Sequence, residues 1–217
     1  MLVAHKEAKL LFIDPGWWKM ELKNYRIGLI TIGLIGILLF TLPSIAFFVS
    51  PNSGQEFSVL YVTGTDHTLE SIPFDVQANS TYSICLGVTN YLRSSAYYTC
   101  FVKLLNETDP LPKVGLETAS PVPSIYQYYI FVESGKTMEE PLTFKVNDIF
   151  FSNNVTMLKS ITINGHDFII NKTSSWDLQK SGYYYEFLIE LWIFNAHDQA
   201  FQFNNRFVQF SLNLTET

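Results

Sequence analysis

Residues 27–49 read IGLITIGLIGILLFTLPSIAFFV and contain no charged side chain. A run of this length is enough for one helix to cross the roughly 30 Å apolar core of a bilayer. It divides the chain into a head, residues 1–26, and a tail, residues 50–217. We therefore expect a single transmembrane helix that places the head and the tail on opposite sides of a membrane.

The basic residues predict the direction of insertion. They gather in the head as Lys6, Lys9, Lys19, Lys23 and Arg26. After the apolar run, no Lys or Arg occurs before Arg93. Positive charge beside a span stays on the cytoplasmic side, so the head is expected inside and the tail outside the cell membrane. Trp17, Trp18 and Tyr25 suit the headgroup layer, and the Arg26 side chain can extend to the same level.

The apolar run has two other interpretations, a cleaved secretory signal and a buried helix of a soluble protein. A cleaved secretory signal has an apolar core of about 7–15 residues and small residues at the cleavage site. This run is longer, and residues 47–50 (FFVS) offer no such site. A buried helix of a soluble protein is seldom so long and so evenly apolar. We therefore expect an uncleaved anchor.

Charge excludes one class of partner. The head has five basic and three acidic residues, net +2, and the tail has nine basic and seventeen acidic residues, net −8. Nucleic-acid binding needs clustered Lys and Arg, which the acidic tail lacks. We expect no nucleic-acid partner and no adhesion of the tail to anionic lipid.

The tail reads as β-structure almost throughout. Tyr, Phe, Ile, Val and Thr dominate short alternating segments, which is typical of strands. Strands are predicted at 57–62, 82–88, 98–104, 126–132, 142–146, 157–163, 167–170, 184–194 and 207–214. Asn164-Gly165 predicts a two-residue hairpin turn because both residue types accept positive φ. About nine short strands predict one immunoglobulin-like antiparallel β-sandwich.

Two stretches interrupt the strand pattern. Residues 109–124 (DPLPKVGLETASPVPS) hold four prolines. They form either a linker between two small domains or a long loop within one sandwich, and we favour the loop because neither half alone offers enough strands. Residues 174–182 predict a helical turn capped by Ser174 or Ser175.

Cys85 and Cys100 are the two cysteines of the chain, and both lie in the tail. An oxidising exterior favours a disulfide between them. They also flank one expected hairpin with its turn near residues 90–95. The register that buries a continuous apolar face in this hairpin puts the two sulfurs on opposite faces. A bulge could restore the bridge. The oxidising compartment thus favours a disulfide, whereas the strand pattern argues against one. We favour two unpaired thiols.

Five N-x-S/T sequons occur in the tail and none in the head. They begin at Asn79, Asn106, Asn154, Asn171 and Asn213. This distribution is typical of an extracytoplasmic domain that carries N-linked glycans. Two or three sequons would arise by chance in loops rich in Asn, Ser and Thr. Asn79, Asn106 and Asn171 lie in predicted turns and are the better candidates.

Motifs that carry catalysis are missing from the sequence. His67, His166 and His197 each stand alone, and no nucleotide, metalloprotease or hydrolase signature occurs. Neighbouring Glu139 and Glu140 point apart in an extended chain, which argues against an acid/base pair. We expect no catalytic residue, no cofactor and no metal site, and hence no enzyme.

One stretch resembles a known family. Residues 87–104 read GVTNYLRSSAYYTCFVKL and follow IPFDVQANSTYSI. They resemble the core hairpin of an archaeal membrane-protein family of unknown function, the domain-of-unknown-function 1616 family. The matching positions are Val88, Asn90, Arg93, Tyr98 and Thr99. EEPLTFKV (139–146), LKSITING (158–165) and ELWIFN (190–195) resemble later strands of its sandwich.

The chain departs from this family in two respects. Members have several spans where this chain has one, and Leu92 stands where an acidic residue is expected. The resemblance implies a cell-surface β-sandwich and supplies no activity.

Two classes of function remain. The first is a membrane-anchored interaction or accessory subunit that docks on a protein partner in the membrane or the cell envelope. Aromatic clusters at 97–98, 128–129 and 183–185 could mark its contact face, although about half of each cluster is expected in the core. The second is a pilin-like structural subunit of a surface filament or lattice. Arg26-Ile27-Gly28 fits poorly there, because the basic residue does not directly precede the small one.

Overall fold

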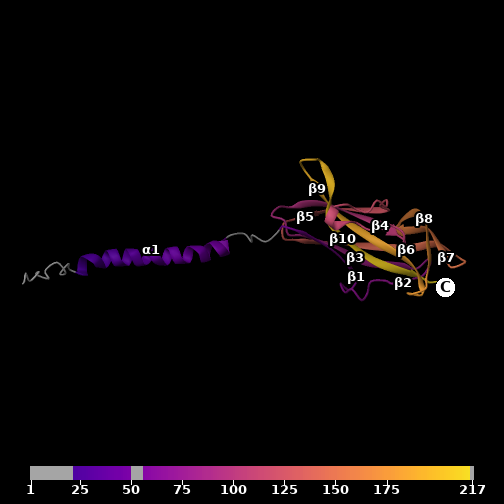
Figure 1. The fold of residues 1–217 in the computed structure, drawn as a ribbon, viewed down its shortest axis with the longest axis horizontal. Coiled ribbons are helices and arrows are strands. Elements are labelled where there is room, and N and C mark those ends of the chain that lie inside the picture. Colours follow the sequence, from indigo (N-terminus) through magenta and orange to yellow (C-terminus); the bar gives the residue numbers. More distant parts are fainter. Residues whose placement is uncertain (1–21, 50–55, 216–217) are drawn as a thin grey trace, which may run out of the picture. The chain divides into compact units, whose positions relative to one another are not determined.

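The computed structural model describes residues 22–49 and 56–215 (Figure 1). The chain divides into two compact units, Met1–Gln55 and Glu56–Thr217. We call the second one the β-unit. The expected interfacial residues Trp17 and Trp18 lie outside the described residues, as does most of the expected head.

Helix α1 covers Leu22–Val49 and includes the whole apolar run. Its side chains are described at Tyr25, which is half exposed, and at residues 28–40. The Arg26 side chain is not among the described ones. Large apolar side chains from Leu29 to Phe40 are exposed around this helix. Within the described part of the chain, no helical segment has both the length and the apolar character that crossing a membrane requires.

The β-unit is mainly β-structure. Its strands are β1 (Ser58–Gly64), β2 (Asp75–Val76), β3 (Thr81–Asn90), β4 (Ala96–Leu105), β5 (Tyr126–Val132), β6 (Thr137–Ser152), β7 (Val155–Ile163), β8 (His166–Asp177), β9 (Gly182–Asn195) and β10 (Ala200–Leu214). They form one curled sheet in the order β1-β3-β6-β7-β8-β9-β10-β2, with β4 paired to β9 and β5 paired to β4. All pairs are antiparallel except β10 with β2, so the sheet is mixed and the expectation of a purely antiparallel sheet is wrong.

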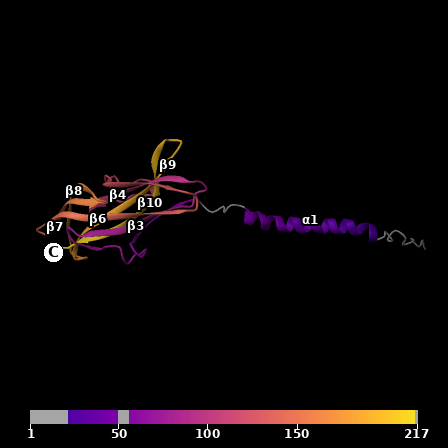
Figure 2. The same ribbon diagram turned by 180° about the vertical axis from the view of Figure 1, so that it is seen from behind.

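The sheet consists of two halves joined at the end of β8. Half A contains β1, β3, β6, β7 and β8, and half B contains β2, β10, β9, β4 and β5. The last residues of β8, Trp176 and Asp177, pair with Tyr183 and Gly182 of β9. The strands run lengthwise through the β-unit, and the β9–β10 turn projects from it in both views (Figures 1 and 2).

The two halves enclose one apolar core. Phe144 of half A and Phe187 of half B pack edge to face with ring centroids 4.9 Å apart. The Tyr185 hydroxyl of half B lies 2.9 Å from the Thr156 hydroxyl of half A, and both residues are fully buried. Burial of apolar side chains from both halves against each other is the main favourable term in the stability of such a fold.

All nine predicted strands are present, but their limits and neighbours differ from the expectation. Strand β6 is longer than predicted at both ends, and the short β2 was missed. The helical turn expected at 174–182 is wrong, because β8 continues to Asp177. The Asp177 carboxylate then accepts hydrogen bonds from the backbone N–H groups of Gln179 and Lys180, at 2.8 and 3.0 Å, in a tight turn. The Asn164-Gly165 hairpin turn is confirmed, with φ of 48° and 80°.

The expected hairpin between the two cysteine strands is also wrong. Strand β3 pairs with β1 and β6 in half A, whereas β4 pairs with β9 and β5 in half B. Asn90 stands at the corner where the chain crosses between the halves, and it is fully buried. Its side-chain amide donates to the carbonyls of Ser94 and Val132, both at 2.9 Å, and its side-chain oxygen accepts from the Tyr98 hydroxyl at 3.2 Å. These bonds satisfy a buried polar group and fix the crossing.

Residues 109–124 connect β4 with its neighbour β5 inside the β-unit. A short 3-10 helix, Val114–Leu116, lies within this segment. Lys113 and Thr118 form a bridge around that helix. The segment is therefore a structured loop over half B, and we call it the proline-rich loop.

Candidate functional site

The outer face of half B carries aromatic side chains in register. Tyr97 of β4 lies opposite Phe131 of β5, and Phe194 of β9 lies opposite Phe201 of β10. Tyr98 pairs with Ile193, so the same register places Tyr97 beside Phe194. One row of four rings thus crosses the four strands. Side chains on one face of neighbouring strands stand about 5 Å apart, close enough for rings to touch.

A second row extends this aromatic surface. Its members are Tyr129 of β5, Trp192 of β9 and Phe203 of β10. We call the seven side chains of the two rows the aromatic face: Tyr97, Tyr129, Phe131, Trp192, Phe194, Phe201 and Phe203. Tyr97 stacks on Tyr129 with ring centroids 6.1 Å apart, and both rings contact Phe201 at 5.5 and 5.9 Å.

Several of these rings are open to solvent. Phe131 is 60% exposed, Tyr129 56%, Tyr97 41% and Phe194 39%. Isolated apolar side chains are common on protein surfaces, but a contiguous patch of large rings is typical of an interaction site. The aromatic face is therefore the main candidate contact surface of the β-unit.

The proline-rich loop covers the part of half B next to the aromatic face. Beneath it, the Lys103 ammonium lies 2.8 Å from the Glu190 carboxylate, and these side chains are 6% and 0% exposed. Ser120 of the loop binds both partners, since its carbonyl accepts from Lys103 at 2.6 Å and its N–H donates to Glu190 at 2.7 Å. The Trp192 indole N–H also donates to Glu190, at 3.2 Å. We call this group the Lys103–Glu190 lock.

The tyrosine clusters highlighted by the sequence split between core and surface. Tyr98 and Tyr185 are fully buried, whereas Tyr97 and Tyr129 belong to the aromatic face. Tyr128 is partly buried and its hydroxyl donates to the carbonyl of Pro141 at 2.8 Å. The sequence could identify Tyr97 and Tyr129 as exposed by alternation, but it could not show that they stack on each other.

Both cysteines are free thiols on opposite halves. Cys85 lies on the outer face of half A, opposite Thr63. Cys100 is buried in the core, and burial raises the pKa of its thiol to about 12. Strands β3 and β4, which carry the two cysteines, are not paired with each other. Neither register considered for a hairpin between them therefore occurs.

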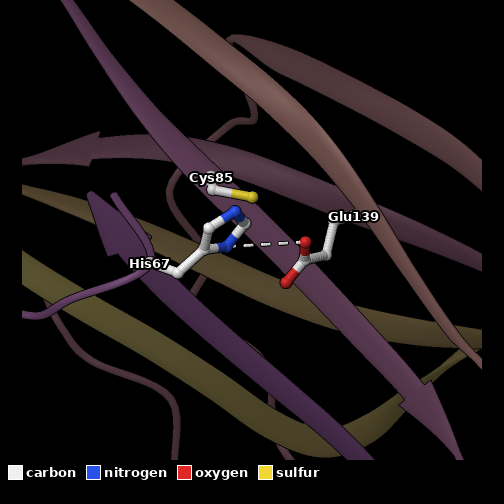
Figure 3. A group of neighbouring side chains, drawn as sticks. All are labelled: His67, Cys85 and Glu139. Atoms are coloured by element: carbon white, nitrogen blue, oxygen red, sulfur yellow. Dashed lines mark ion pairs between the residues drawn. The ribbon is translucent and has the colours of Figure 1, made fainter. Parts of the chain in front are cut away.

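His67, Cys85 and Glu139 converge on the outer face of half A (Figure 3). The expectation that His67 stands alone is wrong, because its Nδ1 lies 3.6 Å from Glu139 Oε2. No local motif could have revealed the group, since its members come from a turn, from β3 and from β6. The pKa of Tyr61 is raised to about 12, mainly because the side chain is partly buried and secondly because its hydroxyl is hydrogen-bonded to Glu139. Burial, and after it the charge of Glu139, raises the pKa of the Cys85 thiol.

The other two histidines of the β-unit, His166 and His197, have local partners. The His166 ring stacks on Tyr126 with centroids 6.4 Å apart, and His197 Nδ1 lies 2.9 Å from Asp198 on the exposed β9–β10 turn. Neither pair is joined by a nucleophile, so these residues suggest no reaction. That the chain is not an enzyme and binds no cofactor stays a prediction.

The five sequons differ in accessibility. Asn79, Asn154 and Asn171 are exposed and adopt positive φ, at 63°, 62° and 51°. The amide nitrogens of the other two are engaged. Asn106 donates to the Thr173 carbonyl, and Asn213 donates to the Asp75 carboxylate, both at 2.8 Å. The structure thus favours Asn154 over Asn106, in contrast to the ranking by sequence.

The sequons also share a location. We name the two ends of the β-unit after its strands. The near end is the one where its first strand, β1, begins at Ser58, and the far end is the one that contains the turn between β8 and β9. The row of rings through Tyr97 lies at the near end, because the hydroxyl of adjacent Tyr98 contacts Ser58 at 2.8 Å. All five sequons lie in the far part of the strands or in turns beyond them, close to residues 145–158, 172–184 and 213.

Comparison with known proteins gives no family. No protein-family model and no curated protein matches the chain. The resemblance to the archaeal membrane-protein family therefore stays a prediction.

Solved structures give only distant matches to the β-unit. A β-glucosidase from Listeria innocua in complex with glucose has 8% identity and a TM-score of 0.38, over 74% of this chain and 16% of the glucosidase. The chain thus spans only a small part of that enzyme. The CARDB domain of a Pyrococcus furiosus protein in complex with di-metal ions has 7% identity and a TM-score of 0.37, over 75% and 90% of the two chains.

A third match is the human complex of zinc 2-glycoprotein with prolactin-inducible protein. It has 10% identity and a TM-score of 0.37, over 76% of this chain and 99% of the matched chain. At these scores the likeness says nothing about activity, ligand or partner.

Proposed function

We propose that the protein is a non-catalytic, membrane-anchored interaction or accessory subunit. In this proposal the β-unit is an immunoglobulin-like sandwich on the outside of the cell, and it docks on a protein partner in the membrane or the cell envelope. The aromatic face is the observation that carries the proposal. It places large rings side by side on one sheet face and leaves several of them exposed.

The chemistry of the aromatic face suits a protein partner. Tyr and Trp bury a large area at low cost in conformational entropy and are enriched among residues that dominate binding energy. No Lys or Arg belongs to the two rows. Tyr97 and Tyr129 carry hydroxyl groups that can make hydrogen bonds at the edge of a contact.

The Lys103–Glu190 lock favours a preformed surface. It fixes the proline-rich loop beside the rings through bonds at Ser120. A surface that is already ordered loses less conformational entropy on binding. The loop and the aromatic face together therefore offer a contact area that a partner need not reorganise.

The sequence supports the membrane placement in this proposal. The uncharged run at 27–49, the basic head and the restriction of all sequons to the tail agree with one orientation. An extracytoplasmic β-unit would present the aromatic face to other surface proteins.

Site-specific photocrosslinking tests the proposal. A photoreactive phenylalanine analogue is placed at Tyr129 of the full chain, in cells that naturally carry the protein. Because this side chain is 56% exposed, the exchange is not expected to disturb folding. We expect one dominant protein adduct after illumination, retained in carbonate-washed membranes. The matched control is the same analogue at Ile169, which is 82% exposed on β8 of half A and is expected to give no adduct.

Substitution of one exposed side chain at a time, with the photoreactive group kept at position 129, completes the test. Phe131→Ser is expected to reduce the adduct at position 129 at least several-fold, whereas Ile169→Ser leaves it unchanged. Equal labelling at positions 129 and 169, or a carbonate-soluble protein, would contradict the proposal. An adduct ladder made of this chain alone would instead support the filament alternative.

A further inference from the structure

Three side chains with metal-binding atoms meet on the surface of half A. One ligand atom each of His67, Cys85 and Glu139 lies within 4.8 Å of the other two. Figure 3 shows them converging from three separate elements, a turn after β1, strand β3 and strand β6. This site lies on the opposite half of the sheet from the aromatic face, so it is independent of the proposed function.

The strand register brings Cys85 and Glu139 together. Residues 84, 86 and 88 of β3 point into the core, so Cys85 and Gly87 point outward. Gly87 pairs with Glu139 of β6 and with Tyr61 of β1. Side chains two positions apart on one face are neighbours, so the Glu139 carboxylate reaches the Cys85 thiol diagonally.

Tyr61 holds the Glu139 carboxylate in place. Its hydroxyl donates to Glu139 Oε1 at 2.6 Å, which leaves Oε2 toward His67. The Tyr61 ring crosses β3 directly above Gly87, where an added Cβ would lie 2.1 Å from the ring. Glycine is therefore required at this position for the tyrosine to span the strand. Partners that orient a ligand in this way are common around metal ions.

The turn after β1 presents His67. This histidine adopts φ of 61°, which is uncommon for a residue with a side chain. The Asp66 carboxylate fixes the turn by accepting from the Thr68 N–H at 3.0 Å, from the Thr68 hydroxyl at 2.9 Å and from the Ser71 hydroxyl. The imidazole is thus positioned by a preformed turn, although it is itself 63% exposed.

The distances suit a small tetrahedral ion. Two ligand atoms bound at about 2.1 Å to a tetrahedral Zn²⁺ lie about 3.4 Å apart. His67 Nδ1 and Glu139 Oε2 are already 3.6 Å apart. A thiolate and an imidazole favour Zn²⁺, whereas Ca²⁺ and Mg²⁺ prefer an all-oxygen set.

We propose that His67, Cys85 and Glu139 bind one Zn²⁺ ion through a nitrogen, a sulfur and an oxygen atom. Three protein ligands leave a fourth position for water or for a donor atom from another molecule. The sequence alone indicates no metal ligand, so this site is recognisable only from the structure.

Titration of the full chain in detergent with Zn²⁺ tests this inference, under reducing conditions. We expect one ion per chain. Substitution of an outer partner of a ligand costs roughly 10–100-fold in metal affinity. Tyr61→Phe is therefore expected to weaken Zn²⁺ binding by about that factor, and Cys85→Ser and His67→Ala by at least as much. His197→Ala is the matched control, because it removes an exposed histidine that also has a carboxylate neighbour.

Co²⁺ provides a readout specific to the thiol. The Co²⁺-loaded wild type is expected to show thiolate-to-cobalt charge-transfer absorption, and Cys85→Ser is expected to lose it while keeping the wild-type circular dichroism spectrum. Cys100→Ser should leave the absorption intact. Absence of stoichiometric Zn²⁺ binding would reduce the group to a surface His67–Glu139 ion pair, and Zn²⁺ binding that survives Cys85→Ser and His67→Ala unchanged would equally overturn the assignment.

Discussion

The two cysteines show how strand position determines the chemistry of one residue type. Cys85 faces outward beside Glu139, and Cys100 faces the core with no exposed surface. A buried thiol resists ionisation because its thiolate would lose the hydration it has in water. The same residue type is therefore a candidate ligand in half A and an apolar packing group in half B.

The buried thiol predicts a pH dependence of stability. Burial raises the pKa of Cys100 from 9.0 to about 12. The unfolded thiol ionises first, so its contribution to stability is complete below pH 9 and is lost as the pH rises toward 12. At pH 10 we expect a loss of about 1 kcal/mol from this group. Urea unfolding at pH 8 and pH 10 measures it.

Cys100→Ala is the comparison for this experiment. The variant lacks the thiol, so its cavity cost is the same at both pH values. The difference in unfolding free energy between wild type and variant should therefore shrink by about 1 kcal/mol from pH 8 to pH 10. An unchanged difference would show that Cys100 ionises equally easily in both states.

Single elements were predictable where alternation is regular. All nine expected strands occur, because apolar and polar residues alternate with the strand period. Pairing was not predictable, since alternation fixes which face is buried but not which strand lies alongside. Strands β3 and β4 follow each other closely in the sequence, yet buried Asn90 turns the chain from half A into half B between them.

The candidate sites were less accessible to sequence reasoning than the strands. Tyr97 and Tyr129 could be placed on an outer face, but their contact depends on the pairing of β4 with β5. His67, Cys85 and Glu139 are far apart in the sequence and meet through the pairing of three elements. No spacing rule reports such a group. Knowledge of the register alone would have shown that residues 61, 85, 87 and 139 share one surface.

The proline-rich loop depends on a buried ion pair, which gives a testable stability effect. Removal of one partner leaves the other charge buried and unpaired, at a cost of roughly 3–5 kcal/mol. We expect Glu190→Ala to lower the unfolding free energy by about this amount, because Lys103 is only 6% exposed. Urea unfolding of the full chain measures the change. Cleavage by trypsin after Lys113 should also become faster, since the loop loses the hydrogen bond from the Ser120 N–H to Glu190.

An exposed ion pair of the same kind is the control. Arg93 and Glu56 lie 2.9 Å apart, but their side chains are 65% and 47% exposed. Glu56→Ala is expected to cost less than about 1 kcal/mol, because solvent screens the pair. The double change Lys103→Met with Glu190→Leu should recover part of the stability lost in Glu190→Ala. Similar losses of unfolding free energy for Glu190→Ala and Glu56→Ala would contradict the stabilising role of the Lys103–Glu190 lock.

At the scale of the whole molecule, the β-unit is asymmetric along its strands. The near end carries the row of rings through Tyr97, and the far part carries all five sequons. This separation follows from the register of β4, β9 and β10 at one end and from the turns at the other. It could not be inferred from the order of residues along the chain.

Glycan mapping tests this asymmetry. In a host that glycosylates asparagine, we expect glycans at Asn79, Asn154 and Asn171, whose side chains are exposed. Occupancy at Asn106 and Asn213 should be clearly lower, because their amide nitrogens donate hydrogen bonds within the fold. Mass spectrometry of glycopeptides measures each site. Glycans confined to Asn106 and Asn213 would contradict the ranking, and a protein bare at all five would contradict the extracytoplasmic placement.

Placement of the sequons at one end has a consequence for life in a crowded surface layer. Hydrated sugars repel neighbouring molecules sterically, so they would shield the far part of the β-unit from chance encounters. The rings at the near end would have no such cover. A binding partner would therefore approach from the near end. The sugars, rather than the contact surface itself, would prevent non-specific contacts with the rest of the β-unit.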